Sequence, residues 1–157
     1  TRHVWVDHCS FLPYPDGLID ITRASTDVTV SYCRFEDHNK VMLIGADPEH
    51  TFDTDIRVTV HHNYFLRTNQ RMPRVRYGKV HVFNNLYEEW GNYGIASTQK
   101  ADVLSQSNIF IAGDNKDATS LSEGEDPLEG FLRSEGDEAR NGAKVVTQEP
   151  PSGGFRP

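Results

Sequence analysis

The sequence predicts an all-β protein whose chain winds into a parallel β-helix, which is a stack of similar coils. Three observations predict this fold. A segment of eight residues recurs five times, each copy alternates as a β-strand does, and no segment keeps the period of an α-helix. Two or three short strands in a repeat of about twenty-odd residues are typical of a solenoid, in which each coil stacks on the next.

The recurring segment starts with alternating β-branched residues, has Cys or Asn at its sixth place and ends on an aromatic residue. Its copies are "VWVDHCSF" (4–11), "VTVSYCRF" (28–35), "VTVHHNYF" (58–65), "VHVFNNLY" (80–87) and, more weakly, "VLSQSNIF" (103–110). A second apolar stretch follows each of the first four copies, at 17–21, 41–45, 74–78 and 93–97. These stretches predict a further strand in each coil.

Stacking the coils places equivalent residues about 4.8 Å apart. The sixth-place residues then form a ladder: Cys9, Cys33, Asn63, Asn85 and Asn108. Asparagine suits a tight bend because it tolerates the left-handed backbone and its amide can bond to the next coil. The eighth-place residues stack in the core behind the ladder: Phe11, Phe35, Phe65, Tyr87 and Phe110. We expect both sets to have structural roles.

The two cysteines occupy the same ladder position in neighbouring coils. Stacked Cα atoms can meet the distance that a disulfide needs, although parallel Cβ vectors do not favour one. Two buried thiols are the interpretation that we favour, and a disulfide is the alternative.

The repeat divides the chain into two parts. Residues 1–112 are expected to form the β-helix coils, whereas residues 113–157 are rich in Gly, Pro and acidic residues, with 10 acidic and 5 basic side chains. We expect this second part to be an irregular or partly disordered tail. The chain also begins within a strand-like segment, so we expect it to be a piece of a longer protein whose N-terminal coils are missing.

Several function classes are disfavoured by the sequence. A net charge of −7 argues against a nucleic-acid binder, and no apolar run is long enough to span a membrane. The seven histidines have no zinc-ligand spacing, and there is neither a Gly-rich phosphate loop nor a serine nucleophile elbow. We expect a monomer without nucleic-acid or membrane partners.

Charged residues interrupt the pattern near the second strand of three neighbouring coils. They are Asp16 and Asp20, then Lys40, then Arg71, Arg74 and Arg76. Stacking would align them in one column. No acid lies between residues 67 and 79, and guanidinium groups match carboxylates with two parallel hydrogen bonds. The cluster therefore predicts an anionic ligand, with salt bridges to the acidic tail as the alternative.

The two aspartates allow two interpretations. Acids in a turn often belong to a solvated loop, and on a straight strand Asp16 and Asp20 would lie about 13 Å apart. Gly17 can provide a bend that brings them together, and flexible turns with carboxylate oxygens suit Ca²⁺. Because Ca²⁺ takes six to eight oxygen ligands, further ligands must come from elsewhere.

At the level of whole motifs, "VWVDHCSF…DGLIDI", "VTVSYCRFEDHNKVMLIG", "VTVHHNYF…QRMPRVRYGKVHVFNN" and "YGIAS…SQSNIF" closely resemble the pectate lyases of polysaccharide lyase family 1. The resemblance covers about residues 2–112. It implies a secreted, right-handed parallel β-helix that cleaves polygalacturonate, an acidic polysaccharide, by Ca²⁺-dependent β-elimination. One calcium ligand of the family and its N-terminal helical cap belong to a region upstream of this chain.

The resemblance also implies roles for single residues. Asp16 and Asp20 match calcium ligands, Arg71 matches the catalytic base, and Lys40 and Arg76 match the contacts to substrate carboxylates. Arginine is normally protonated, so the role of Arg71 follows from the resemblance alone. Two rival functions are a pectin lyase acting on methyl esters, which would not need the two aspartates, and a non-catalytic carbohydrate-binding scaffold, which would not need an arginine beside a calcium site.

Overall fold

The computed structural model describes residues 1–122 and 128–157, and it forms three parallel sheets, here called A, B and C. Sheet A contains β1 (Arg2–Asp7), β4 (Thr26–Ser31), β7 (Arg57–His61), β10 (Lys79–Phe83), β13 (Asp102–Gln106) and β16 (Phe131–Glu135). Sheet B contains β2 (Ser10–Phe11), β5 (Arg34–Glu36), β8 (Tyr64–Leu66), β11 (Leu86–Glu88), β14 (Ile109–Ile111) and β17 (Glu138–Arg140). Sheet C contains β3 (Ile19–Ile21), β6 (Met42–Ile44), β9 (Arg74–Arg76), β12 (Ile95–Thr98) and β15 (Thr119–Ser120).

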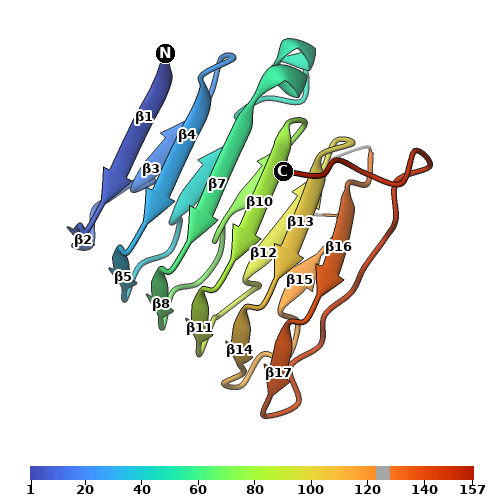
Figure 1. The fold of residues 1–157 in the computed structure, drawn as a ribbon. Coiled ribbons are helices and arrows are strands. Elements are labelled where there is room, and N and C mark those ends of the chain that lie inside the picture. The colour runs from blue at the N-terminus through green and yellow to red at the C-terminus, as the bar shows by residue number, and fades with distance from the viewer. Residues whose placement is uncertain (123–127) are drawn as a thin grey trace.

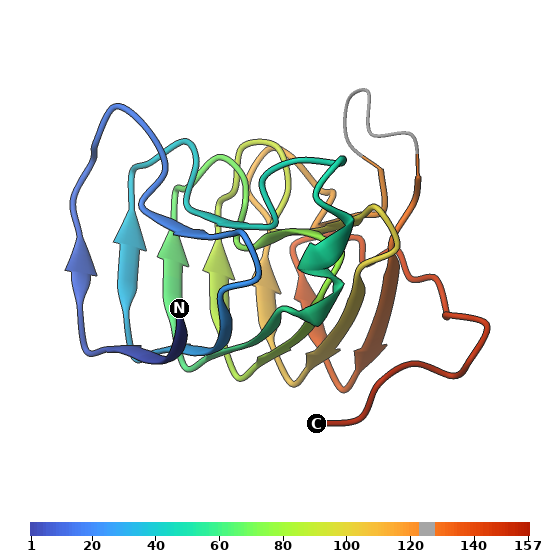
Figure 2. The same cartoon turned by 90° about the horizontal axis from the view of Figure 1, so that it is seen from above.

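Each coil passes through sheet A, then B, then C, and the next coil repeats this path beside it (Figures 1 and 2). Val28 in β4, for example, pairs in parallel with Val4 on one side and with Val58 on the other. The 3-10 helix η1 (Thr51–Asp55) precedes β7 in a turn from sheet C to sheet A. The predicted parallel β-helix is confirmed. No helix in the described ranges is long and apolar enough to cross a membrane.

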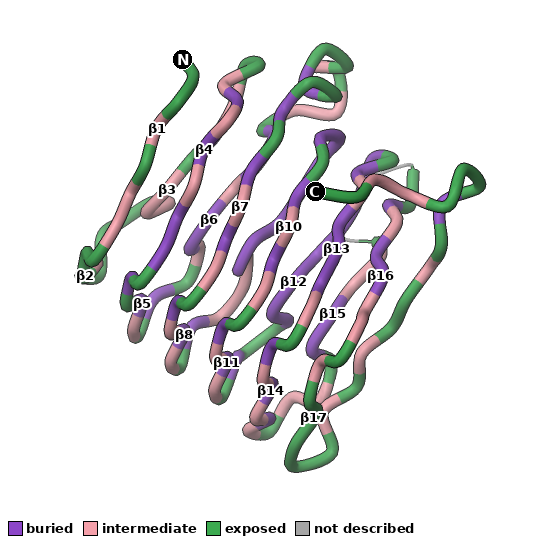
Figure 3. The backbone as a smooth tube through the Cα atoms, in the orientation of Figure 1, coloured by how far each residue is buried: buried purple, intermediate pink, exposed green. Residues whose placement is uncertain are grey.

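The core lies between the three sheets and is filled by the inward half of each alternating strand (Figure 3). Val58 and Val60 of β7 are at most 3% exposed, whereas Arg57, the residue before Val58, is exposed. This is the burial pattern that a period of two produces when one face of a strand points inward. Burial of apolar side chains in every coil therefore fixes the register of the stack.

The predicted asparagine ladder is confirmed. Asn63 accepts a hydrogen bond from the backbone N–H of Cys33 at 2.9 Å and donates through Nδ2 to the carbonyl oxygen of Val30 at 3.0 Å. Asn85 repeats these roles by accepting from the Asn63 backbone at 2.9 Å, and Asn108 accepts from the Asn85 backbone at 2.9 Å. The ladder thus satisfies backbone donors that would otherwise be buried without a partner.

The predicted aromatic stack is confirmed as well. Ring centroids along the stack are 4.7, 5.0, 4.8 and 4.7 Å apart, and neighbouring rings are nearly parallel. The members are Phe11, Phe35, Phe65, Tyr87 and Phe110. This spacing matches the distance between paired strands, about 4.8 Å, so coil stacking sets the ring stacking.

Both cysteines are free thiols, as we favoured, but only one is buried. Cys33 lies inside the ladder, and burial raises the pKa of its thiol. Cys9, in the first coil, is exposed. The expectation of two buried thiols is therefore wrong for Cys9, because no described coil packs against its outer side.

The expectation of an irregular tail is wrong for residues 119–120, 131–135 and 138–140. These residues form β15, β16 and β17, which pair in parallel with β12, β13 and β14, so β15 ends the fifth coil and β16 and β17 begin another. Its repeat escapes notice in the sequence because Asp137 replaces the ladder asparagine and Ala139 replaces the stacked aromatic residue. Asp137 accepts from the Asn108 backbone N–H at 2.8 Å, so a carboxylate continues the ladder as an acceptor. Residues 141–157 contain no named strand.

Candidate active site

The predicted charged residues lie on the turns from sheet B to sheet C and on sheet C itself, in the first three coils. Asp16, Lys40 and Arg71 occupy the three successive turns that lead into β3, β6 and β9. Lys40 forms a parallel bridge with Gln70, and the carbonyl oxygen of Arg71 accepts from the Met42 backbone at 2.6 Å. The turns therefore stack on one another, and the predicted column is present.

Asp16 and Lys40 face each other across the first two turns. The Lys40 Nζ atom is 3.5 Å from Asp16 Oδ1. The Lys40 side chain is 40% exposed and the Asp16 side chain is 78% exposed. His38, which is buried, contacts the first turn, with Nε2 at 2.9 Å from the carbonyl oxygen of Asp16. This contact of His38 with the turn could not be predicted from the sequence. An exposed ion pair of this kind contributes at most about 1 kcal/mol to stability, so both charges remain available to a ligand.

Asp20 lies on β3 with its carboxylate folded back over Gly17. A Cβ atom added to Gly17 would lie only 2.8 Å from Asp20 Oδ1, so a larger residue here would push this carboxylate out of its position. The Asp20 carboxylate thus lies against Gly17, the residue that follows Asp16 in the chain. Carboxylate oxygens on turns suit Ca²⁺, so Asp16 and Asp20 are the residues here whose chemistry would allow them to serve as ligands of such an ion. Within residues 1–122 and 128–157, no group of three or more acidic, His or Cys side chains converges to complete it.

Arg71 has the left-handed backbone conformation, with φ of 66°. Such a conformation costs a non-glycine residue on the order of 1 kcal/mol, and neighbouring coils hold it on both sides. The Met42 N–H donates to the Arg71 carbonyl, and the Met72 N–H donates to Gly94 at 2.9 Å. The Nε atom of Arg71 is buried and has no hydrogen-bond partner. The side chain thus starts from a fixed backbone and keeps an unused donor.

Arg74 and Arg76 are both buried, and Val75 between them points into the core. Arg74 is aligned with Leu43 of β6, which is aligned with Asp20 of β3. Arg76 lies at the far end of β9 and donates through Nη1 to the Ala46 carbonyl oxygen at 3.2 Å. Neither arginine lacks a partner. The predicted alternative of salt bridges to the acidic tail, residues 113–157, falls partly on residues 123–127, which lie outside the described residues.

One cation of the cluster has counter-ions that the sequence analysis did not foresee. Arg67 bonds to Asp37 at 2.7 Å and to Glu36 at 2.6 Å, both in the preceding coil. The guanidinium lowers the pKa of Asp37, and the two carboxylates raise the pKa of Arg67. The absence of acids between residues 67 and 79 therefore did not mean that every cation there lacks a counter-ion, because stacking brings acids from elsewhere in the sequence.

A group of amides next to Lys40 was also missed. Asn39 accepts at Oδ1 from Asn69 Nδ2 at 2.7 Å and from Gln70 Nε2 at 3.1 Å. These bonds tie the second turn to the third beside the Lys40 backbone. The sequence does contain several amide residues at this turn, but only the stacking of the coils shows that their side chains contact one another.

The family and its solved structures agree with this geometry. The sequence model of the family described as "Pectate lyase" matches residues 1–128. "Putative pectate lyase 21" of Arabidopsis thaliana is 43% identical over 150 residues, which cover 91% of this chain and 38% of that protein. "Pectate lyase" of Nicotiana tabacum is 40% identical over 151 residues, with the same two coverages of 91% and 38%.

Among solved structures, the major allergen from cedar pollen, jun a 1, superposes with a TM-score of 0.85 at 39% identity, covering 93% of this chain and 44% of the other. A pectate lyase solved with a bound hexasaccharide has a TM-score of 0.72 at 25% identity, with coverages of 90% and 41%. The chain thus spans about two fifths of the length of these relatives, and the likeness confirms a right-handed parallel β-helix. The chain belongs to the pectate lyase family.

Proposed function

We propose that the protein to which this chain belongs cleaves polygalacturonate by Ca²⁺-dependent β-elimination. The observation that carries the proposal is the stack of three turns, which aligns Asp16, Lys40 and the fixed backbone of Arg71. An exposed ammonium group beside carboxylates suits a ligand that brings its own carboxylates together with a divalent cation. The hexasaccharide bound to a related pectate lyase supports an oligosaccharide ligand.

The reaction breaks the bond between C4 of a galacturonate unit and its glycosidic oxygen. The proton at C5 is removed, a C4=C5 double bond forms, and the departing oxygen takes a proton from solvent. We assign the C5 proton to the guanidine of Arg71. The role follows from the family resemblance, and in this chain the backbone of Arg71 is held by hydrogen bonds on both sides. A fixed base lowers the barrier because its orientation costs no entropy in the transition state.

Negative charge develops at the C6 carboxylate when the C5 proton leaves. Lys40 and Arg76 are proposed to hold substrate carboxylates, where positive charge stabilises the transition state. Lys40 is 40% exposed at its side chain and is directly accessible. Arg76 is buried, so its contact with substrate must be made by the part of its guanidinium that faces away from the carbonyl oxygen of Ala46.

Asp16 and Asp20 are the residues of this chain that would hold Ca²⁺, together with oxygens from outside the chain. When bound, Ca²⁺ supplies electrostatic stabilisation of the carboxylate at the reacting unit. We further propose that the protein is secreted, because a polysaccharide of this size must be met outside the cell, and that it acts as a monomer.

Two rival functions are separated by one set of assays. Unsaturated uronide release is measured from polygalacturonate and from its methyl ester, each with and without a calcium chelator. The proposal predicts activity on polygalacturonate that the chelator abolishes. Faster cleavage of the methyl ester in the presence of chelator would indicate a pectin lyase, and binding without cleavage of either polymer would indicate a non-catalytic scaffold.

A further inference from the structure

A second set of stacked rings lies outside the core, on the turn from sheet A to sheet B. In each of the first five coils, the residue that precedes the ladder position has a left-handed backbone and is exposed. These residues are His8, Tyr32, His62, Asn84 and Ser107, with φ between 49° and 55°. This corner of the coil differs from the B-to-C turns that carry Asp16, Lys40 and Arg71.

The first three of these residues form a continuous stack of rings. His8 and Tyr32 have ring centroids 4.9 Å apart with planes at 13°, and Tyr32 and His62 are 4.9 Å apart at 21°. A contact between the Nδ1 atoms of His61 and His62 at 2.8 Å holds the last ring. The next coil has Asn84 in place of a ring, so the stack ends at His62.

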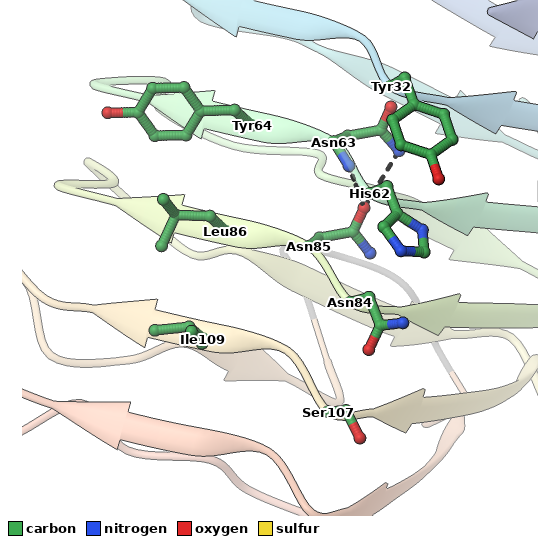
Figure 4. A pocket seen from close by; sticks show the side chains of 9 residues that line it. All are labelled: Tyr32, His62, Asn63, Tyr64, Asn84, Asn85, Leu86, Ser107 and Ile109. Atoms are coloured by element: carbon green, nitrogen blue, oxygen red, sulfur yellow. Dashed lines mark hydrogen bonds between the residues drawn. The ribbon is translucent and has the colours of Figure 1, made fainter.

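A pocket begins where the stack ends (Figure 4). It has a volume of about 480 Å³ and is lined by Tyr32, His62, Asn63, Tyr64, Asn84, Asn85, Leu86, Ser107 and Ile109. Figure 4 shows Tyr32, His62, Asn84 and Ser107 in one column along the edge of the pocket. A flat ligand can therefore occupy the next step of the stack beyond His62.

The lining has three kinds of group. The His62 ring offers a flat face, and Leu86 and Ile109, which are paired neighbours in sheet B, offer aliphatic surface. Asn84 and Ser107 offer an amide and a hydroxyl, and neither side chain forms a hydrogen bond within the described part of the chain. Ligand sites commonly combine an apolar surface with a few polar groups that fix orientation.

We propose that this pocket binds a neutral pyranose unit of a glycan. A pyranose has an apolar C–H face that can lie on the His62 ring, and a rim of hydroxyls that can bond to Asn84 and Ser107. The lining contains no Asp, Glu, Lys or Arg. A uronate would leave its carboxylate without a cation here, although carboxylates in binding sites are usually met by Arg or Lys. The pocket thus takes a different ligand from the acidic polymer proposed for the active site.

The test is an NMR titration of the full chain with methyl β-D-galactopyranoside, followed by galacturonate and phenol as comparison probes. The amide signals of Asn84, Leu86 and Ser107 are expected to shift with the neutral sugar, with a Kd on the order of millimolar for a ligand of this size. Shifts with galacturonate alone, shifts with phenol alone, or no shift at these residues would overturn the proposal.

A substitution that fills the pocket gives a sharper test. Asn84→His places a ring at the next step of the stack, and His62 shows that this backbone conformation accepts one. We expect an unchanged melting temperature and at least a tenfold loss of sugar affinity. Asn92→His, in an exposed turn between sheets B and C, is the matched control and should bind the sugar normally. His62→Ala removes the ring that the sugar stacks on and should also abolish binding. Normal sugar binding by Asn84→His or His62→Ala would refute the site.

Discussion

Replacing Asn63 by alanine tests the energetic role of the ladder. The side chain of Asn63 is buried, accepts from the Cys33 N–H at 2.9 Å and donates to Val30 at 3.0 Å and to Asn85 Oδ1 at 3.0 Å. Alanine leaves the Cys33 N–H buried without a partner, at a cost of about 1–3 kcal/mol. Loss of the two donated bonds adds about 1 kcal/mol. We therefore expect Asn63→Ala to lower the free energy of unfolding by about 2–4 kcal/mol.

Urea unfolding followed by circular dichroism measures this loss, and an unchanged m-value shows that the compactness of the two states is kept. Asn92→Ala is the control, because Asn92 is exposed and its side chain has no hydrogen bond in the described structure. The control should change stability by less than about 0.5 kcal/mol. Equal stability of the two variants would refute the ladder as a source of stability. A normal turnover number per folded molecule is also expected, because Asn63 lies far from the B-to-C turns.

The remaining predictions concern the active site, the core and pH. Arg71→Lys should retain less than about a tenth of wild-type kcat at saturating calcium, a deficit above about 1.4 kcal/mol. Arg76→Lys should instead weaken both kcat and substrate binding mildly, and identical kinetics of the two variants would contradict their separate roles. Asp20→Ala should abolish activity at low calcium and recover only partly in excess calcium, and full activity in chelator would exclude the metal role. Phe65→Ala removes a fully buried ring that stacks on two others, so it should cost about 3–5 kcal/mol in urea unfolding, and a loss below about 1 kcal/mol would contradict the stack. Burial lowers the pKa of His61 below its usual value of 6.5, so the unfolded state binds more protons and stability should fall as pH decreases below about 6.5; melting temperatures of His61→Gln between pH 5 and 7 should vary less than those of the wild type.

Most of the fold could be predicted from the sequence because one rule repeats. Strand alternation, the ladder position and the aromatic position recur in register, and parallel stacking turns that recurrence into contacts. The prediction failed in the last coil, where Asp137 and Ala139 replace the two most recognisable residues. Asp137 can replace asparagine there because the Asn108 backbone needs only an acceptor. Residue identity alone does not show that equivalence.

The candidate site could be predicted in its members but not in its contacts. The column of turns followed from the repeat, and the Asp16–Lys40 pair confirms that the first two turns meet. The pairing of Arg67 with the preceding coil and the burial of Arg76 under the 45–46 turn did not follow. Both depend on the directions in which long side chains bend across neighbouring coils. Sequence spacing specifies the position of a Cα atom but not the direction of a guanidinium group.

The most direct test of β-elimination is the mass of the products released from polygalacturonate. Elimination forms a C4=C5 double bond without adding water, so the new non-reducing end is lighter by one water molecule than the product of hydrolysis and absorbs ultraviolet light. We expect every new non-reducing end to carry this unsaturated unit, and we expect Arg71→Lys to release almost none. Products with the mass of hydrolysed oligogalacturonate, or unsaturated products formed equally well by Arg71→Lys, would contradict the account.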